Sequence, residues 1–228
     1  ADSASALAAS TDITITGSNS ITDVNSVVTG ATAGSRTVSY ELSGTFASLL
    51  TTSSPTVRTG STALKVGKIT VTNSVSALQA DTVDSWGTGP STNATLVYNV
   101  SDTAASLVTA IDAASTQLAA INGAASVSFT DSTLTVAQAA KISDLSKFSG
   151  TYSITDSATS IYNALNTQRS ASSNASDRPL IEGASSVTLE TVTTGGFASV
   201  DQVLGVQGLT TDASETKGIS SISGTTYS

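Results

Sequence analysis

Residues 98–107 read Tyr-Asn-Val-Ser-Asp-Thr-Ala-Ala-Ser-Leu, and residues 152–161 repeat this pattern as Tyr-Ser-Ile-Thr-Asp-Ser-Ala-Thr-Ser-Ile. The first four residues of each copy alternate apolar and polar side chains, which is typical of a strand with one buried face. The aspartate that follows stands just before an apolar-periodic stretch, where its side chain can cap a helix. The pattern therefore predicts a unit of strand, tight polar turn and short helix.

The alternating strand recurs along the whole chain. Its copies start near residues 13, 38, 69, 98, 127, 152 and 187. A unit of this length cannot bury its apolar face alone, but stacked units can, and a helix is the usual crossover between parallel strands. The sequence predicts a β-rich fold with short helices, a repeat solenoid of strand–turn–helix units with parallel strands. The alternative is a set of ordinary α/β or Ig-like β-sandwich domains, in which the similarity comes from a low-complexity background.

We expect residues 1–228 to form a single elongated repeat array. The third residue of each strand should lie in one stacked core column, made of Ile15, Tyr40, Val71, Val100, Phe129, Ile154 and Leu189. Residues 81–95 and 166–183 break the rhythm, and we expect both to be insertion loops at the surface. Trp86, in the first of them, is either a local plug or an anchor for a partner.

Both chain ends read as parts of a unit. Residues 1–7 resemble the half that follows a strand, residues 224–228 resemble the start of a unit, and neither end carries a polar capping unit. We expect a segment of a longer chain, or a subunit that stacks head to tail.

The composition excludes several kinds of chemistry. The chain has no His, Cys or Met, which excludes a Ser-His-Asp triad, a cysteine nucleophile, disulfides and imidazole or thiolate metal sites. The net charge of −8, with nine scattered basic residues, argues against nucleic acid and anionic lipid as partners. No apolar run is long enough to insert in a membrane. This Ser/Thr-rich, acidic composition suits an exported protein, so we expect an extracellular location at the cell surface.

The recurring Asp102, Asp131 and Asp156 allow two interpretations. A ladder of carboxylates could bind calcium. Alternatively, each aspartate caps the helix that it precedes and favours the positive end of its dipole. Asn73 and Gly17 stand at matching positions and would hold a metal poorly, so we favour capping and predict no metal and no cofactor. Calcium is the disfavoured alternative.

We predict that the chain is not an enzyme and has no catalytic residue. A polysaccharide-acting enzyme needs paired carboxylates and usually aromatic rings that stack on sugars. Asp81 and Asp84 are near each other in sequence but have no accompanying base. The aromatic residues at inward strand positions, expected in the core, are Tyr40, Tyr98, Phe129 and Tyr152.

The run VSDTAASLVTAI, followed by LAAINGAASVSFTDSTLTVAQAAKI and GTYSITDSATSIYNAL, resembles the Ala/Thr/Asp-rich repeats of bacterial cell-surface proteins. These are S-layer-like proteins, large adhesins and biofilm proteins. The resemblance is good over residues 98–165 and weaker over 13–80 and 187–203. It implies a non-enzymatic exported protein. Many members carry calcium-binding glycine-rich nonapeptides, which this chain lacks.

These observations predict a non-enzymatic structural protein of an extracellular surface layer, sheath or filament that acts by self-assembly. Its main partner would be itself, head to tail or laterally, with surface glycans as a further candidate. An alternative function is an adhesin or phage-type fibre module that binds carbohydrate through the two insertion loops. A polysaccharide-acting enzyme is the third.

Overall fold

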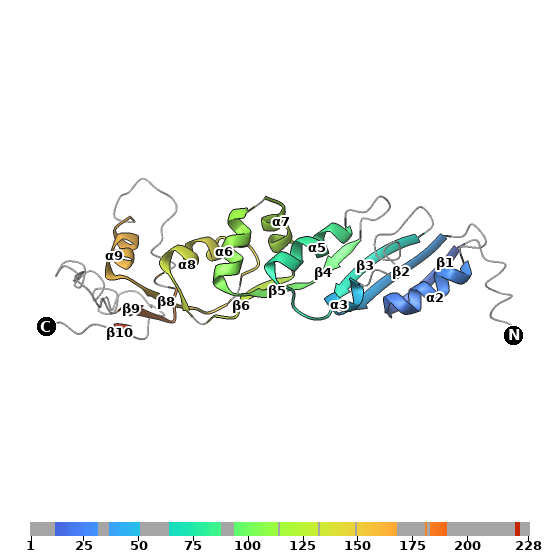
Figure 1. Ribbon diagram of the computed structural model, residues 1–228, viewed down its shortest axis with the longest axis horizontal. Coiled ribbons are helices and arrows are strands. Elements are labelled where there is room, and N and C mark those ends of the chain that lie inside the picture. Colours follow the sequence, from blue (N-terminus) through green and yellow to red (C-terminus); the bar gives the residue numbers. More distant parts are fainter. Residues whose placement is uncertain are drawn as a thin grey trace. The chain divides into compact units, whose positions relative to one another are not determined.

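Parallel strands alternate with helices in the computed structural model (Figure 1). It describes residues 12–31, 37–50, 64–87, 94–113, 115–131, 133–148, 150–167, 181, 183–190 and 222–223. The strands are β1 (Asp12–Asn19), β2 (Thr37–Gly44), β3 (Leu64–Val71), β4 (Thr95–Val97), β5 (Asn99–Asp102), β6 (Ser126–Phe129), β7 (Thr133–Leu134), β8 (Ser153–Asp156), β9 (Ser186–Leu189) and β10 (Ile222–Ser223). The helices are α2 (Ile21–Ala31), α3 (Phe46–Leu49), α5 (Ala77–Gly87), α6 (Ala104–Ala113), α7 (Ser115–Gly123), α8 (Val136–Ser143) and α9 (Ala158–Thr167).

The chain divides into two compact units. The first unit comprises residues 1–102 and 112–127, and the second comprises residues 103–111 and 128–228. The predicted single array over residues 1–228 stays a prediction. No described helix is both long and apolar enough to cross a membrane.

The first unit contains a four-stranded parallel sheet in the order β1-β2-β3-β4. Val38 of β2 pairs with Ile13 of β1 on one side and with Leu64 of β3 on the other, and all three side chains are buried. Helix α2 packs against β1 and β2 and adds Ile21 and Val24 to the same core. The helix is amphipathic, and its apolar face packs against the apolar side of the strands, whose side chains alternate between the two faces of the sheet.

The second unit contains a parallel sheet in the order β10-β9-β8-β7. Leu134, Ile154 and Val187 pair in register across three of these strands, and each is buried. Helices α8 and α9 lie on the same side of β8 and β9 (Figure 1). Ile154 is therefore a central core residue of this unit, as the sequence predicts.

A third, two-stranded sheet joins β5 and β6. Within the first unit, the backbone amide of Ala125 donates to the carbonyl of Tyr98, and the hydroxyl of Ser126 donates to the side chain of Asn99. Val75, between β3 and α5, forms a parallel bridge with Val100 of β5.

The predicted parallel pairing is confirmed, because each described strand pair with a determined register is parallel. The alternative of Ig-like sandwich domains is wrong for this part of the chain, since such sandwiches are built from antiparallel sheets. The predicted single core column is also wrong. The described strands lie in three small sheets and do not form one closed solenoid, and two column residues, Ile15 and Phe129, are only half-buried.

Two pairings differ from the predicted register by an even number of residues. Ile154 pairs with Val187 rather than with Leu189, a difference of two, and Ile69 pairs with Leu42 of β2 rather than with Val38, a difference of four. A slip of one residue would turn every side chain to the opposite face, but a slip of an even number leaves each side chain on its own face. Apolar–polar alternation alone therefore cannot fix which of two registers forms.

Candidate functional site

The main candidate site is the polar residue that recurs where a strand ends. In space, its side chain lies beside the first residue of a helix. In four cases its side chain accepts a hydrogen bond from the first backbone amide of a helix. The pairs are Asn73 Oδ1 with Phe46 N at 2.7 Å, Asp102 Oδ2 with Ala77 N at 3.0 Å, Asp131 Oδ2 with Ala104 N at 2.7 Å, and Asp156 Oδ2 with Val136 N at 3.0 Å. The predicted capping role is confirmed for these residues.

The predicted choice of helix is wrong. Asp102 precedes α6 but caps α5, and Asp156 precedes α9 but caps α8. The parallel register explains this. Leu134 pairs with Ile154, so the residue two positions beyond Ile154 faces the residue two positions beyond Leu134, which is the first of α8. Each side chain therefore completes the helix of the preceding strand–helix unit.

In six of the described helices, a different residue supplies a cap from the same strand–helix repeat. The hydroxyl of the residue before the helix accepts a hydrogen bond from the third helical amide. These residues are Ser20, Thr45, Ser76, Thr103, Thr135 and Ser157. Thr135 also forms a capping box with Gln138, whose side chain accepts from the Thr135 amide. The first and third amides, which a helix cannot satisfy internally, thus receive separate partners.

Each of the three aspartates bonds to a different helix start. No group of three or more His, Cys, Asp or Glu side chains that could hold a metal ion occurs among the described residues. Asp156 connects two successive strand–helix repeats within the second unit, because its Oδ1 accepts from the amide of Ser157, at the start of its own helix, while Oδ2 caps α8. The chemistry of this arrangement is backbone capping.

Trp86 lies in a helix rather than in a loop. Residues 81–87 form the second half of α5, so the predicted insertion loop at 81–95 is wrong there, and residues 88–93 lie outside the described residues. Trp86 is only 2% exposed and stacks on Phe46, with ring centroids 5.8 Å apart. The plug interpretation is therefore correct, and the partner-anchor interpretation is wrong.

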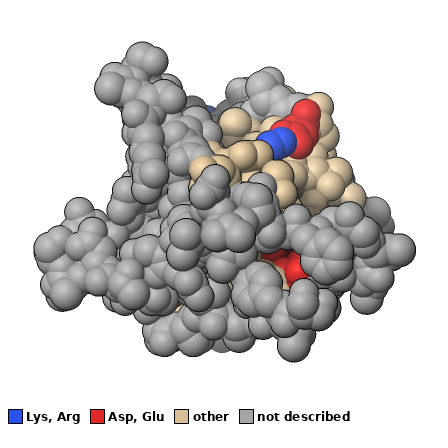
Figure 2. Space-filling view, turned by 90° about the vertical axis from the view of Figure 1, so that its left-hand side faces the viewer, with Lys and Arg blue, Asp and Glu red and all other residues tan. Residues whose placement is uncertain are grey.

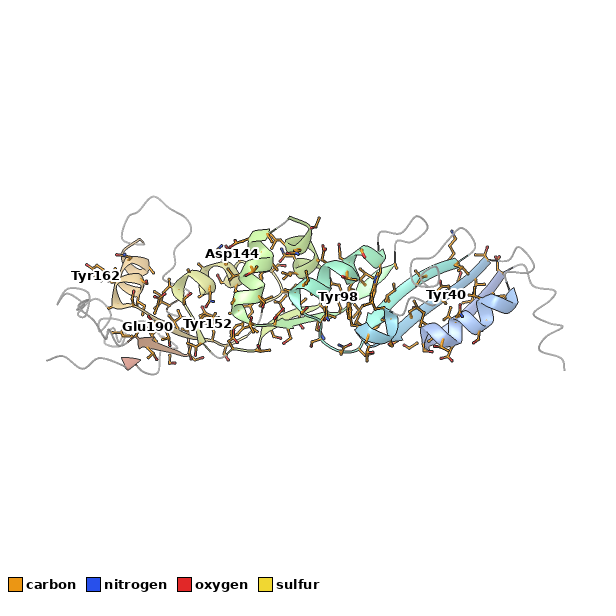
Figure 3. The ribbon with its side chains drawn as sticks, viewed as in Figure 1. Tyr40, Tyr98, Asp144, Tyr152, Tyr162 and Glu190 are labelled. Carbon is orange, nitrogen blue, oxygen red and sulfur yellow. The ribbon has the colours of Figure 1, made fainter. Side chains whose placement is uncertain are left out.

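The prediction that four aromatic residues lie in the core is confirmed for Tyr40 and Tyr98 and is wrong for Phe129 and Tyr152. Tyr40 and Tyr98 are buried in the first unit, as predicted (Figure 3). In the second unit Phe129 and Tyr152 are half-buried, and both rings contact Phe148. Burial raises the pKa of the Tyr40 and Tyr152 phenols above their usual value.

Tyr98 holds the end of another segment in place. Its hydroxyl donates to the carbonyl of Ala120, near the end of α7. Burial, and secondly the nearby carboxylate of Asp84, raise the pKa of Tyr98 to about 12. The carboxylate of Asp84 thus lies close enough to the Tyr98 phenol to disfavour its ionisation. Asp81 and Asp84 both lie in α5.

The second predicted insertion, residues 166–183, falls largely outside the described residues. Asn166 and Thr167 are the last residues of α9, and residues 168–180 and 182 are not described.

On the face drawn in Figure 2, acidic and basic side chains lie side by side in one patch, and most of the other coloured atoms are uncharged.

Comparison with protein families, with known proteins and with solved structures finds no match to this chain.

Proposed function

We propose that the chain is a non-enzymatic structural protein of an extracellular surface layer, sheath or filament, and that it acts by self-assembly. The observation that supports this most is the series of caps between successive units. In four helices, the first backbone amide donates a hydrogen bond to a side chain of the next strand–helix repeat along the chain. A unit built in this way is completed by its neighbour, which is the energetic principle of stacked repeats. We infer from it the finer architecture, a solenoid of strand–turn–helix units.

The outer strands provide a route to assembly. Among the described residues, β1 and β4 are the outer strands of the first sheet, and β10 and β7 are those of the second. An outer strand presents backbone groups that can pair with another chain. A contact between unlike ends builds an open filament or a continuous array when its rotation does not close a ring, and lateral pairing would widen that assembly.

The composition favours an extracellular setting. A chain with few charges, many hydroxyl side chains and no Cys or Met presents a hydrated surface with no thiol or thioether to oxidise. The resemblance to bacterial cell-surface repeats points the same way. Surface glycans are a further candidate partner.

Sedimentation and electron microscopy of the purified chain test the proposal. We expect sheets or filaments that form as concentration rises. Thr14→Lys places a charge on the exposed side of β1 and should weaken assembly, because lysine on an outer strand opposes edge pairing. Thr22→Lys adds the same charge on an exposed position of α2 and should leave assembly intact.

A chain that stays monomeric at every concentration would contradict the proposal. Glycan binding by that monomer would favour the adhesin or phage-fibre alternative. Turnover of a polysaccharide, abolished by a single carboxylate substitution, would instead favour the enzyme. Since Trp86 is buried in α5, a glycan-binding site would have to use other side chains.

A further inference from the structure

A depression of about 420 Å³ lies on strands β1, β2 and β3 of the first unit. Its size falls within the range of small-molecule sites, about 300–1,000 Å³. The polar residues that line it are Thr14, Thr16, Ser39, Glu41 and Lys65, together with the glycines Gly17 and Gly67. The lining residues of β2 and β3 alternate with the buried Tyr40 and Val66, so they belong to the face of the sheet opposite the core.

The depression forms where the strand pairing is irregular at the same level on both sides of β2. The register between β1 and β2 shifts between Thr14 and Ser18, and that between β2 and β3 shifts between Tyr40 and Glu41. Gly17 has a φ of 84°, which favours glycine, and Gly67 is the extra residue in β3. Bulges leave the extra residue outside the ladder and often lie beside binding sites.

The missing side chains create the space. A Cβ atom built on Gly17 would meet no atom within 4 Å, and one built on Gly67 would meet only the Tyr40 carbonyl oxygen, at 3.9 Å. The floor is therefore backbone, and hydroxyl groups of threonine and serine stand around it. Such groups donate and accept hydrogen bonds, as polyhydroxylated ligands require.

The charges favour an acidic ligand. Lys65 and Lys68 are the basic residues among the described residues of the first unit, although the whole chain carries a net charge of −8. Lys68 is the register partner of Glu41, so these opposite charges face each other across two strands. Lys65 is the register partner of the neutral Ser39 and lines the depression. It can offer its ammonium group to an anion.

We propose that this depression binds a sugar acid, a polyhydroxylated ligand that carries a carboxylate. The carboxylate would contact Lys65, and the sugar hydroxyls would bond to Thr14, Ser39 and Glu41. A single ammonium group suits one carboxylate better than a polyphosphate, which needs several cations or a nest of amides. The inference does not depend on self-assembly.

Calorimetric titration of the full chain with D-galacturonate and with D-galactose tests the proposal. We expect galacturonate to bind at least tenfold more tightly than neutral galactose, because a hydrogen bond to a charged group is the stronger kind. Lys65→Gln should weaken galacturonate about tenfold. Gly67→Val should abolish binding while the chain stays folded, since the added side chain meets open space and valine favours strands. Lys147→Gln, an exposed lysine of the second unit, is the matched control and should bind as the wild type does.

A galacturonate trimer separates the two sources of this chemistry. Tighter binding of the trimer points to an acidic polysaccharide, and equal binding points to a free sugar acid; both results support the site. Equal affinity for galacturonate and galactose, no binding at millimolar concentration, or equal effects of Lys65→Gln and Lys147→Gln would overturn the proposal.

Discussion

Asp102 caps a helix that begins 25 residues before it, with its Oδ2 atom 3.0 Å from the backbone nitrogen of Ala77. Ser76 caps the same helix from within its own strand–helix repeat, because its hydroxyl accepts a hydrogen bond from the amide of Gln79. The start of α5 thus depends on two successive repeats of the first unit, one of which contributes a local cap and the other a long-range cap. The long-range cap fixes the register between these repeats, because only one pairing brings the carboxylate to the first amide.

Asp102→Ala should destabilise the first unit by about 1 kcal/mol, the usual cost of losing a helix cap. Asp102→Asn should cost less, because Asn73 makes the same contact with Phe46 at the equivalent place. Chemical unfolding gives the free energies. Hydrogen exchange of the Ala77 amide gives a local measure, and its protection should fall in the alanine variant.

Asp144→Ala is the matched control for that experiment. Asp144 is exposed and is the C-cap residue of α8 through its backbone amide, which an alanine keeps (Figure 3). Its removal should leave the stability within about 0.5 kcal/mol of the wild type. An Asp102→Ala variant as stable as Asp144→Ala would show that the long-range cap adds nothing.

Ile154→Ala should destabilise the second unit by roughly 2–5 kcal/mol, because Ile154 lies fully buried between Leu134 and Val187. Ile154→Asp should cost more still, since an unpaired charge would be buried. Thr155→Ala, the next residue on the same strand, points to the opposite face and should cost much less. Unfolding curves that fail to separate Ile154→Ala from Thr155→Ala would contradict this assignment of the core.

Trp86→Ala should destabilise the first unit by about 3–5 kcal/mol, as expected for the loss of a large buried aromatic side chain. Trp86→Phe keeps an aromatic ring against Phe46 and should cost less. Denaturant unfolding followed by circular dichroism measures both. An alanine variant of wild-type stability would mean that Trp86 is exposed in solution.

The sequence was enough to predict the type and order of most elements. Strands start within one residue of six predicted starts, and a described helix directly follows four of these strands, β1, β2, β5 and β8, because alternation and apolar periodicity are local signals. The length of β2 and β3 could not be found from four-residue windows. The strand before α8 is β7, at Thr133 and Leu134, rather than the one near 127. Its two residues are too short to give a periodic pattern.

The site was predicted in part. A polar residue beside a helix start indicated capping, which Asp102, Asp131 and Asp156 confirm. The helix that each one caps depends on the pairing between units, which is a property of three-dimensional register. The predicted parallel pairing could have identified the right helix. In such a pairing, a residue just beyond one strand lies opposite the helix start that follows the preceding strand. The depression on β1–β3 arises from bulges, and alternation patterns do not report these.

Chelation should leave the stability nearly unchanged. In the described part of the chain the carboxylates of these aspartates accept hydrogen bonds from backbone amides, so they do not need a bound cation as a partner. We expect the melting temperature in EGTA to lie within about 1 °C of that in calcium, which corresponds to a small fraction of a kcal/mol. Scanning calorimetry measures it. A large fall in EGTA would show that calcium binds and contributes to the fold.

Alkaline pH should weaken the first unit through Tyr98. The pKa of its phenol is raised from 10.0 to about 12 in the folded chain, first by burial and then by Asp84. As pH rises above 10, the unfolded chain therefore loses this proton before the folded chain does. The stabilising contribution is fully present below pH 10 and is lost as pH rises through 12. A shift of this size corresponds to about 2–3 kcal/mol.

Tyr98→Phe removes the ionisable group and keeps the ring. At pH 8 the variant should be less stable than the wild type by about 1 kcal/mol, because it lacks the hydrogen bond to Ala120. Near pH 11 the difference should shrink or reverse, since only the wild type must keep the Tyr98 proton bound against the solution. Tyr40 leaves part of the alkaline loss in both proteins, because burial raises the pKa of its phenol as well. Urea unfolding at the two pH values, followed by fluorescence of Trp86 in the same unit, gives the comparison. Parallel loss of stability in the two proteins would mean that Tyr98 ionises as readily in the folded chain as in the unfolded one.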